Sequence, residues 1–255
     1  MNKEELLKKI TEKKEFSQLP KKDVEMAFNK FDKPNYIDEE KVKLTRDLLR
    51  KVFSVFASQK LLNLRDKKPE WILKKHISTR ERFGYYPELY KRLLNEFNNG
   101  KKTIFDLGAG INGFSYEFFP KNTSYMGIEG MKQLVDLMNY YFNKEKLTAG
   151  AIHESLFEIE KIKDCIKSVK GKKIIFLFKV IDSLEMIKGD YSKVLLNELT
   201  PLVDRMIVSF ATRSLIKREK FKANRNWIKE FIRENFEILD EFELGTEKYI
   251  SFKSK

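Results

Sequence analysis

The 255-residue sequence is poor in the residues that build covalent or metal-stabilised folds. It contains one cysteine, Cys165, and two histidines, His76 and His153. A single thiol cannot form an internal disulfide, and these three residues do not supply the ligand cluster that a structural zinc site requires. A disulfide scaffold and a zinc-organised domain are therefore excluded, and we expect no metal.

Long hydrophobic runs are missing as well. No stretch approaches the roughly 18 uninterrupted apolar residues of a membrane-spanning helix. Residues 1–16 mix acidic, basic and apolar residues and lack the apolar centre of a signal peptide. Because 42% of the residues are hydrophobic, the chain can build a core and overall disorder is excluded. We expect a soluble, cytoplasmic protein that does not engage a membrane.

Acidic residues are in the minority. The 51 Lys and Arg residues outnumber the 38 Asp and Glu residues, which gives a formal net charge of +13. Such an excess attracts polyanions, of which nucleic acid is the commonest partner. A biased genome or a hot habitat gives the same composition, with much of the charge on solvated faces. Charge alone therefore favours a nucleic-acid partner without identifying one.

The hydrophobic pattern changes near residue 75. Before it, apolar residues recur at helical spacing in three segments separated by Pro20 and by a turn at residues 32–36, which predicts three helices. After it, short apolar runs alternate with helical segments, as in an α/β sheet. The runs are 103–107, 124–129, 173–179, 205–210, 236–242 and 248–252. The last two are joined by a short connection containing Gly245, so we predict an antiparallel hairpin at one edge of an otherwise parallel sheet.

The first of these runs leads into a glycine-rich turn, DLGAGING at residues 106–113. Glycines let the backbone turn tightly and approach a ligand at the carboxyl end of a parallel strand. Gly108, Gly110 and Gly113 fit the dinucleotide-binding spacing, and Glu129 at the end of the next run can accept hydrogen bonds from both ribose hydroxyls. The pattern indicates a nucleoside cofactor, and the alternative is a plain glycine-rich turn.

Asp106 helps to choose between two nucleoside cofactors. A carboxylate directly before the turn would repel a pyrophosphate, whereas it suits the cationic amino group of a methionine tail. The sequence therefore favours S-adenosylmethionine over NAD.

Residues 76–82, HISTRER, come immediately before the α/β unit and have two compatible interpretations. In the first, Ser78 caps a helix and Glu81 bonds back to its amide, forming a capping box. In the second, the segment contacts a ligand, because an arginine can pair bidentately with a carboxylate such as that of methionine. The second rests on more hydrogen-bonding side chains than a cap needs: His76, Thr79, Arg80 and Arg82.

Together these segments resemble the aminoglycoside-resistance methyltransferases of small-subunit (16S) ribosomal RNA, the Arm and Rmt enzymes. The resemblance runs nearly end to end and rests on the helical N-terminal module and four motifs: HISTRER (76–82), DLGAGIN (106–112), IFLFKVIDSLE (175–185) and IVSFATRSLIKRE (207–219). It implies an α/β, Rossmann-like, seven-stranded S-adenosylmethionine-dependent methyltransferase fold. Residues 76–255 would form the methyltransferase domain, and residues 1–75 a helical domain that docks on RNA or the ribosome.

The resemblance also implies a site. Carried over by position, the residues that bind S-adenosylmethionine would be His76, Thr79, Arg82, Asp106, Gly108, Ala109, Gly110, Glu129, Glu154 and Ser155. Lys179 would line the pocket of the target guanine, whose N7 accepts the methyl group. Because guanine N7 carries no proton, no catalytic acid or base is assigned. RNA phosphates would pair with Arg213, Lys217, Arg218 and Lys220.

Departures from the family's motifs gather at the substrate end. Ser-Phe-Ala at residues 209–211 replaces Ser-Phe-Pro, and Ile216 replaces a glycine. Near the donor, Glu129 replaces an aspartate and Gly113 a proline. We expect a monomer that acts on 16S rRNA in the small ribosomal subunit. The sequence leaves open which nucleotide is methylated and whether the modification serves drug resistance or ordinary ribosome maturation. The alternatives are a non-catalytic RNA- or ribosome-binding protein that retains the fold, and a nicotinamide-dependent oxidoreductase.

Overall fold

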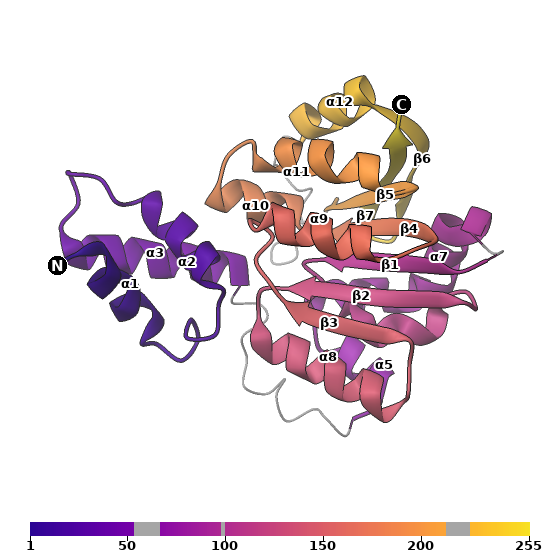
Figure 1. Ribbon diagram of the computed structural model, residues 1–255, viewed down its shortest axis with the longest axis horizontal. Helices are drawn as coiled ribbons and strands as arrows, with labels where there is room; N and C mark the ends of the chain where they lie inside the picture. The colour runs from indigo at the N-terminus through magenta and orange to yellow at the C-terminus, as the bar shows by residue number, and fades with distance from the viewer. Residues whose placement is uncertain (54–66, 98–99, 213–224) are drawn as a thin grey trace.

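A seven-stranded mixed sheet forms the centre of the larger part of the molecule in the computed structural model, which describes residues 1–53, 67–97, 100–212 and 225–255 (Figure 1). The strands follow the order β3-β2-β1-β4-β5-β7-β6 across the sheet. They are β1 (Lys102–Leu107), β2 (Thr123–Glu129), β3 (Ala149–His153), β4 (Lys172–Phe178), β5 (Arg205–Ala211), β6 (Phe236–Leu244) and β7 (Glu247–Ser254).

The parallel strands β1 and β4 lie at the point where the strand order changes direction: β2 and β3 extend the sheet on one side of β1, and β4 and β5 extend it on the other. β1 pairs in parallel with β2 on one side and with β4 on the other, so that Asp106 lies between Gly127 and Phe176 in register. The loops after these strands diverge at this point, and in α/β sheets such a point is where ligands bind. Every side chain of β1 is buried, which fixes the end of the strand firmly.

The strands expected from the six apolar runs are all present, and the antiparallel hairpin is confirmed. β7 pairs antiparallel with both β5 and β6, and Gly245 turns the hairpin at a φ of +63°. The sequence analysis missed β3, which is short and contains three small residues. Tertiary contacts hold it, because the Asn139 side chain donates to the Ala151 carbonyl and accepts from the Ala151 amide, both at 2.8 Å.

Helices cover both faces of the sheet (Figure 1). One layer contains α7, α8 and the 3₁₀ helix η4, which contacts both of them, and the opposite layer contains α9, α10 and α11. The helices of these layers are α7 (Tyr86–Leu94), η4 (Asn112–Phe118), α8 (Lys132–Lys144), α9 (Ile159–Ser168), α10 (Ile181–Ile187) and α11 (Tyr191–Leu199). The same part of the chain also contains α12 (Asn226–Asn235) and the 3₁₀ turns η2 (Phe83–Tyr85), η3 (Asn95–Phe97) and η5 (Thr200–Leu202). The described helices include none long and apolar enough to cross a membrane.

Three N-terminal helices stand beside the sheet, and they correspond to the three helices predicted from the pattern before about residue 75 (Figure 1). They are α1 (Lys3–Thr11), α2 (Lys21–Asn29) and α3 (Asp38–Phe53). Ile10, Phe28 and Leu49, one from each helix, are fully buried and form their common core. α2 and α3 contact α10, and Lys30 Nζ donates to the Met186 carbonyl at 2.5 Å.

Two further short helices connect this unit to the sheet. α5 (Pro69–Leu73), which the sequence analysis did not predict, packs against η4. α6 (Ile77–Arg82) contains most of the HISTRER segment and leads into η2. The N-terminal helices and the sheet thus meet along α10, next to the carboxyl ends of the parallel strands.

Candidate functional site

A cleft of about 850 Å³, its open mouth included, lies at the carboxyl ends of β1, β2 and β4. Its sheet side is formed by the glycine turn after β1, by Glu129, by α6 and by residues after β4. The opposite side comes from the N-terminal helices and includes Asp23 of α2 and Val52 and Phe53 of α3. The cleft therefore lies between two parts of the chain that are far apart in sequence.

Most of the predicted site residues lie together in this cleft. Its lining includes His76, Thr79, Arg82, Asp106, Gly108, Ala109, Gly110, Glu129 and Lys179. Glu154 and Ser155 lie directly after β3 behind the lining, where the Glu154 amide donates to the Glu129 carbonyl at 3.2 Å. The cleft wall continues instead through the next two residues, Leu156 and Phe157. The predicted RNA contacts Arg213, Lys217, Arg218 and Lys220 lie outside the described residues.

The three glycines of the turn are required for two different structural reasons. Gly108 and Gly110 adopt left-handed φ values of +70° and +55°, which side chains strongly disfavour. Gly113 has an ordinary φ, but a Cβ there would come within 2.6 Å of Phe142 Cζ. The turn leads into η4, a seven-residue 3₁₀ helix, in place of the long α-helix whose N-terminus holds a pyrophosphate in dinucleotide sites. The local geometry thus suits a cofactor without phosphates.

Glu129 is held by the turn that it faces. Its Oε2 accepts a hydrogen bond from the Gly110 amide and its Oε1 one from the Met131 amide, both at 2.8 Å. Burial raises the pKa of Glu129, and the surrounding backbone amides oppose the shift. Each carboxylate oxygen has a second lone pair, so this side chain can still accept hydroxyl donors from a ligand.

Asp106 is buried at the base of the cleft and is supported by polar neighbours. Its Oδ2 accepts hydrogen bonds from Asn112 Nδ2 at 2.8 Å and from the Tyr125 hydroxyl at 2.9 Å. Burial raises the pKa of Asp106 to about 7, although both hydrogen bonds and the charge of Arg82 oppose the shift. A cation bound beside it would therefore stabilise the ionised form.

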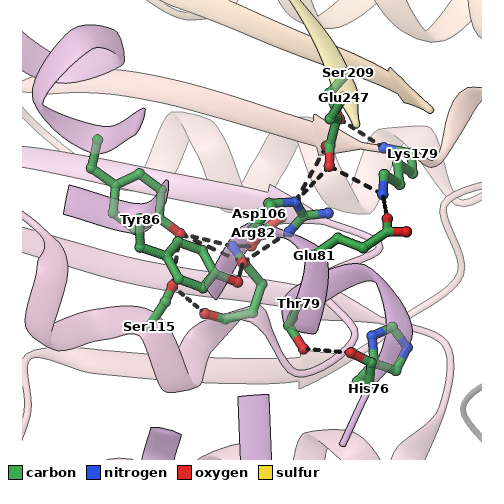
Figure 2. A network of polar contacts seen from close by, with 12 residues as sticks. His76, Thr79, Glu81, Arg82, Tyr86, Asp106, Ser115, Lys179, Ser209 and Glu247 are labelled. Carbon is green, nitrogen blue, oxygen red and sulfur yellow. Dashed lines mark hydrogen bonds and ion pairs between the residues drawn. The ribbon is translucent and has the colours of Figure 1, made fainter. Parts of the chain in front are cut away.

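Arg82 belongs to a buried ion-pair network next to Asp106 (Figure 2). Its Nε lies 3.0 Å from Glu247 Oε2, and its Nη1 donates to Asn112 Oδ1 at 3.1 Å. Burial alone would raise the pKa of Glu247, but Arg82 and Lys179 hold it below its ordinary value. Any contact of Arg82 with a cofactor carboxylate would be made in addition to this pair.

Lys179 joins the same network from the end of β4 (Figure 2). Its Nζ lies 2.7 Å from Glu81 and 3.2 Å from Glu247, and its backbone has a φ of +60°. A left-handed backbone at a lysine is strained, and such strain persists only where surrounding contacts impose it. The Lys179 amide donates to Ser209 Oγ at 3.1 Å, while the Ser209 hydroxyl donates to Glu247.

The predicted capping box at Ser78 is wrong. α6 begins at Ile77 with His76 at the N-cap position, and no side chain caps it there. The Glu81 carboxylate pairs with Lys179 at the end of β4, because a charged partner binds it more strongly than a backbone amide. Ser78 instead lines the cleft.

His76 and Thr79 of the same segment are buried. Thr79 Oγ1 donates to the Leu73 carbonyl at 2.6 Å, which ties α6 to α5. Burial, together with the charges of Arg82 and Lys179, lowers the pKa of His76 to about 3. The imidazole is therefore neutral at physiological pH and does not add to the positive charge of the cleft.

Sequence analysis missed two carboxylates of this region. Glu247 opens the apolar run of β7, and a charged residue at the start of a buried strand was the only sequence signal for it. Asp23 follows Lys21 and Lys22 in the first turn of α2 and looks like a residue of a solvated helix end. The structure buries it, with 4% of its surface exposed, in the wall of the cleft.

Solved structures of known proteins match this chain over its whole length. No protein-family model and no curated protein matches the sequence. The 16S rRNA methylase RmtB superposes with a TM-score of 0.81 at 20% identity, covering 100% of this chain and 99% of that chain.

Two further structures match equally fully. An rRNA methylase from Escherichia coli has a TM-score of 0.80 at 20% identity, and the 16S rRNA methyltransferase RmtF in complex with S-adenosyl-L-homocysteine has 0.80 at 18%. Both cover 100% of each chain. This chain therefore has the fold of these methylases, N-terminal helices included, and the expected seven-stranded methyltransferase fold is confirmed.

Proposed function

We propose that this chain is an S-adenosylmethionine-dependent methyltransferase of small-subunit ribosomal RNA and a member of the Arm and Rmt family. It would act in the cytoplasm, as a monomer, on N7 of a guanine within the assembled subunit. The observation that carries the proposal is the full-length likeness to RmtB, RmtF and the E. coli enzyme, combined with a cleft lined by most of the residues that the resemblance assigns to the cofactor.

The donor set of the cleft fits the parts of S-adenosylmethionine. Glu129 would accept hydrogen bonds from the ribose hydroxyls, and Asp106 would face the cationic amino group of the methionine. Arg82, with Thr79 and the neutral His76 beside it, would meet the methionine carboxylate. Leu156 and Phe157 offer an apolar wall for the base. RmtF, which has the same fold, is in complex with the demethylated product of this cofactor.

The residues of this site would act by alignment. When bound, the cofactor supplies an electrophilic methyl group on a sulfonium. Guanine N7 has an in-plane lone pair and no proton, so no general base is needed, and the low pKa of His76 is consistent with a residue that moves no proton. Fixed carboxylates and the Lys179 network would hold the two reactants in line and keep water away, which supplies rate through effective molarity.

Docking on RNA is proposed for residues 1–75, with residues 76–255 as the methyltransferase domain. A net charge of +13 suits a broad polyanion, and binding energy spread over many phosphates can offset the few kcal/mol needed to extrude a base. Methylation of a guanine in the drug-binding region of the subunit would confer aminoglycoside resistance. Two observations count against the nicotinamide alternative: the short η4 after the glycine turn and the carboxylate of Asp106 beside it.

The proposal is tested by incubating the purified protein and radiolabelled S-adenosylmethionine with intact small subunits, naked rRNA or a decoding-site hairpin. We expect strong labelling of the subunits, little of the hairpin, and a modified guanine on mapping the product. Calorimetric titrations with S-adenosylhomocysteine and NADH accompany it. Binding of NADH alone would favour hydride chemistry, and binding of neither ligand together with subunit binding would identify a non-catalytic binder.

A further inference from the structure

The N-terminal helices contribute to the cleft a buried carboxylate with one unsatisfied oxygen. Asp23 of α2 is 4% exposed and lines the cleft, and among the residues that the structure describes its Oδ2 has no hydrogen-bond partner. A buried acceptor that lacks a donor is costly, and native structures nearly always satisfy such atoms with protein, water or a ligand. The position of Asp23 in the wall of an open cleft indicates a ligand donor.

The surroundings of Asp23 define which part of a nucleoside would reach it. Ser155 contacts its carboxylate, while the charges of Glu129 and Glu154 act on it from the ends of β2 and β3. If Glu129 holds the ribose, the base extends from there along Leu156 and Phe157, which directly follow Ser155. Asp23 therefore faces the region where the outer edge of the base would lie.

The chemistry of that edge matches a carboxylate. Adenine carries one exocyclic amino group, which is a hydrogen-bond donor, and an ionised carboxylate only accepts. We propose, on the basis of the proposed function, that Asp23 accepts a hydrogen bond from the exocyclic amino group of the cofactor's adenine. The donor site is then assembled from both parts of the chain, and the bound cofactor bridges α2 to the sheet.

A purely structural role for Asp23 makes different demands. An acidic side chain in the first turn of a helix interacts favourably with the helix dipole. An exposed carboxylate does this equally well, and it needs neither burial nor a position in a cleft. Burial raises the pKa of Asp23 to about 7, so a helix dipole alone does not keep this carboxyl fully ionised, whereas a hydrogen-bond donor on a bound ligand favours the ionised form.

The test removes the amino group and the carboxylate separately and together. The ligands are S-adenosylhomocysteine and its 6-desamino analogue, in which hydrogen replaces the amino group and N1 remains an acceptor. The proteins are the unmodified full chain, Asp23→Ala, Asp23→Asn and the control Asp47→Asn. Asp47 lies on α3 in the same helical unit, and its side chain is 45% exposed and paired with Arg50.

We expect the unmodified protein to bind the 6-desamino analogue roughly 10- to 100-fold more weakly than S-adenosylhomocysteine, as for loss of a charge-assisted hydrogen bond. Asp23→Ala should lose about the same factor with S-adenosylhomocysteine and change within about twofold with the analogue. Asp23→Asn keeps an acceptor oxygen without its charge and should lose only severalfold. Asp47→Asn should match the unmodified protein with both ligands.

The outcomes separate the two proposals. If the unmodified protein binds S-adenosylhomocysteine but does not discriminate against the analogue, this inference is overturned while the proposed function stands. Equal weakening of both ligands by Asp23→Ala and Asp23→Asn would assign Asp23 a structural role and also overturn it. Absence of any S-adenosylhomocysteine binding would overturn the proposed function, and the inference with it. The isosteric asparagine variant keeps the test decisive should the alanine variant not fold.

Discussion

The two walls of the cleft differ in how completely their charged groups are satisfied. On the sheet wall, Asp106, Glu129 and Glu247 each have at least two hydrogen-bond or ion-pair partners within the chain. On the helical wall, Asp23 is also buried, yet one of its oxygens lacks a hydrogen-bond partner within the described part of the chain. The sheet wall is therefore organised before any ligand arrives, whereas the helical wall is completed by one.

The connections of the two walls differ in the same way. The sheet wall is joined by strand pairing and by ion pairs between residues up to 165 positions apart. The helical wall reaches the rest of the described chain mainly through side-chain and helix contacts: those of α2 and α3 with α10, the Lys30 to Met186 hydrogen bond, the packing of Pro20 and Phe53 near Gly130, and the contact of Asp23 with Ser155. Substitutions on the sheet wall should therefore change both stability and binding, and those on the helical wall mainly binding.

The largest effect is expected from breaking the buried pair of the sheet wall. Arg82→Ala leaves Glu247 buried with only the Lys179 charge beside it, and removal of one partner from a buried pair costs about 3–5 kcal/mol. Urea unfolding should show this loss. The control is Arg92→Ala, which removes an exposed pair with Asp240 and should change stability by less than about 1 kcal/mol. Equal losses of unfolding free energy in both variants would contradict the expected difference between a buried and an exposed ion pair.

The next effect concerns cofactor affinity. Glu129→Ala removes charge-assisted acceptors for the ribose and should weaken S-adenosylhomocysteine binding by about 1.5–3 kcal/mol. Glu237→Ala, at the far edge of the sheet on β6, serves as the control and should bind normally. Circular dichroism establishes that both variants fold. Unchanged affinity in folded Glu129→Ala would remove Glu129 from the cofactor site.

A smaller effect is expected from pH. Burial raises the pKa of Asp106 to about 7, so the folded state binds a proton on this carboxyl more tightly than the unfolded state does. Protonated Asp106 therefore contributes to the free energy of unfolding at low pH, and this contribution is lost as pH rises through 7. The cationic methionine, like the charge of Arg82, favours the ionised carboxylate. Affinity for S-adenosylhomocysteine should therefore rise by about tenfold between pH 6 and pH 8.

Calorimetry in buffers of different ionisation enthalpy should detect the protons released when the ligand binds. Asp106→Asn should reduce this release, and Asp23→Asn should reduce the remainder, since burial raises the pKa of Asp23 to a similar value. The same proton release in all three proteins would show that neither carboxyl ionises on binding.

The smallest effect is expected where the helical wall meets α10. Lys30→Ala removes one hydrogen bond to the Met186 carbonyl, and a bond of this kind contributes about 0.5–1.5 kcal/mol at most. Thermal unfolding should shift by only a few degrees, and the shift should shrink when S-adenosylhomocysteine bridges the two walls. A larger shift in the presence of ligand would contradict the bridging role.

Sequence analysis predicted those parts of the molecule that depend on local pattern. Six strands follow from apolar runs, and the Gly108 turn and Glu129 follow from residues close in sequence. β3 was missed because its small residues give no apolar run and its position depends on Asn139. The burial of Asp23 and the pairing of Arg82 with Glu247 depend on segments that only the fold brings together. The same cause explains the wrong capping box, since Lys179 takes the Glu81 carboxylate.

The insertion of β7 between β5 and β6 also sets an order of events during synthesis. A chain made from its N-terminus contains Arg82 and Lys179 long before it contains Glu247, and until β7 enters the sheet these two cations lack their shared counterion. Domains begin to form as they emerge from the ribosome, so β1 to β5 can associate first, whereas β6 joins the sheet only through β7. The last strand to be made thus neutralises the end of the sheet that lines the cleft, and an incomplete chain that ends before it has a glycine turn but lacks the Glu247 ion pairs.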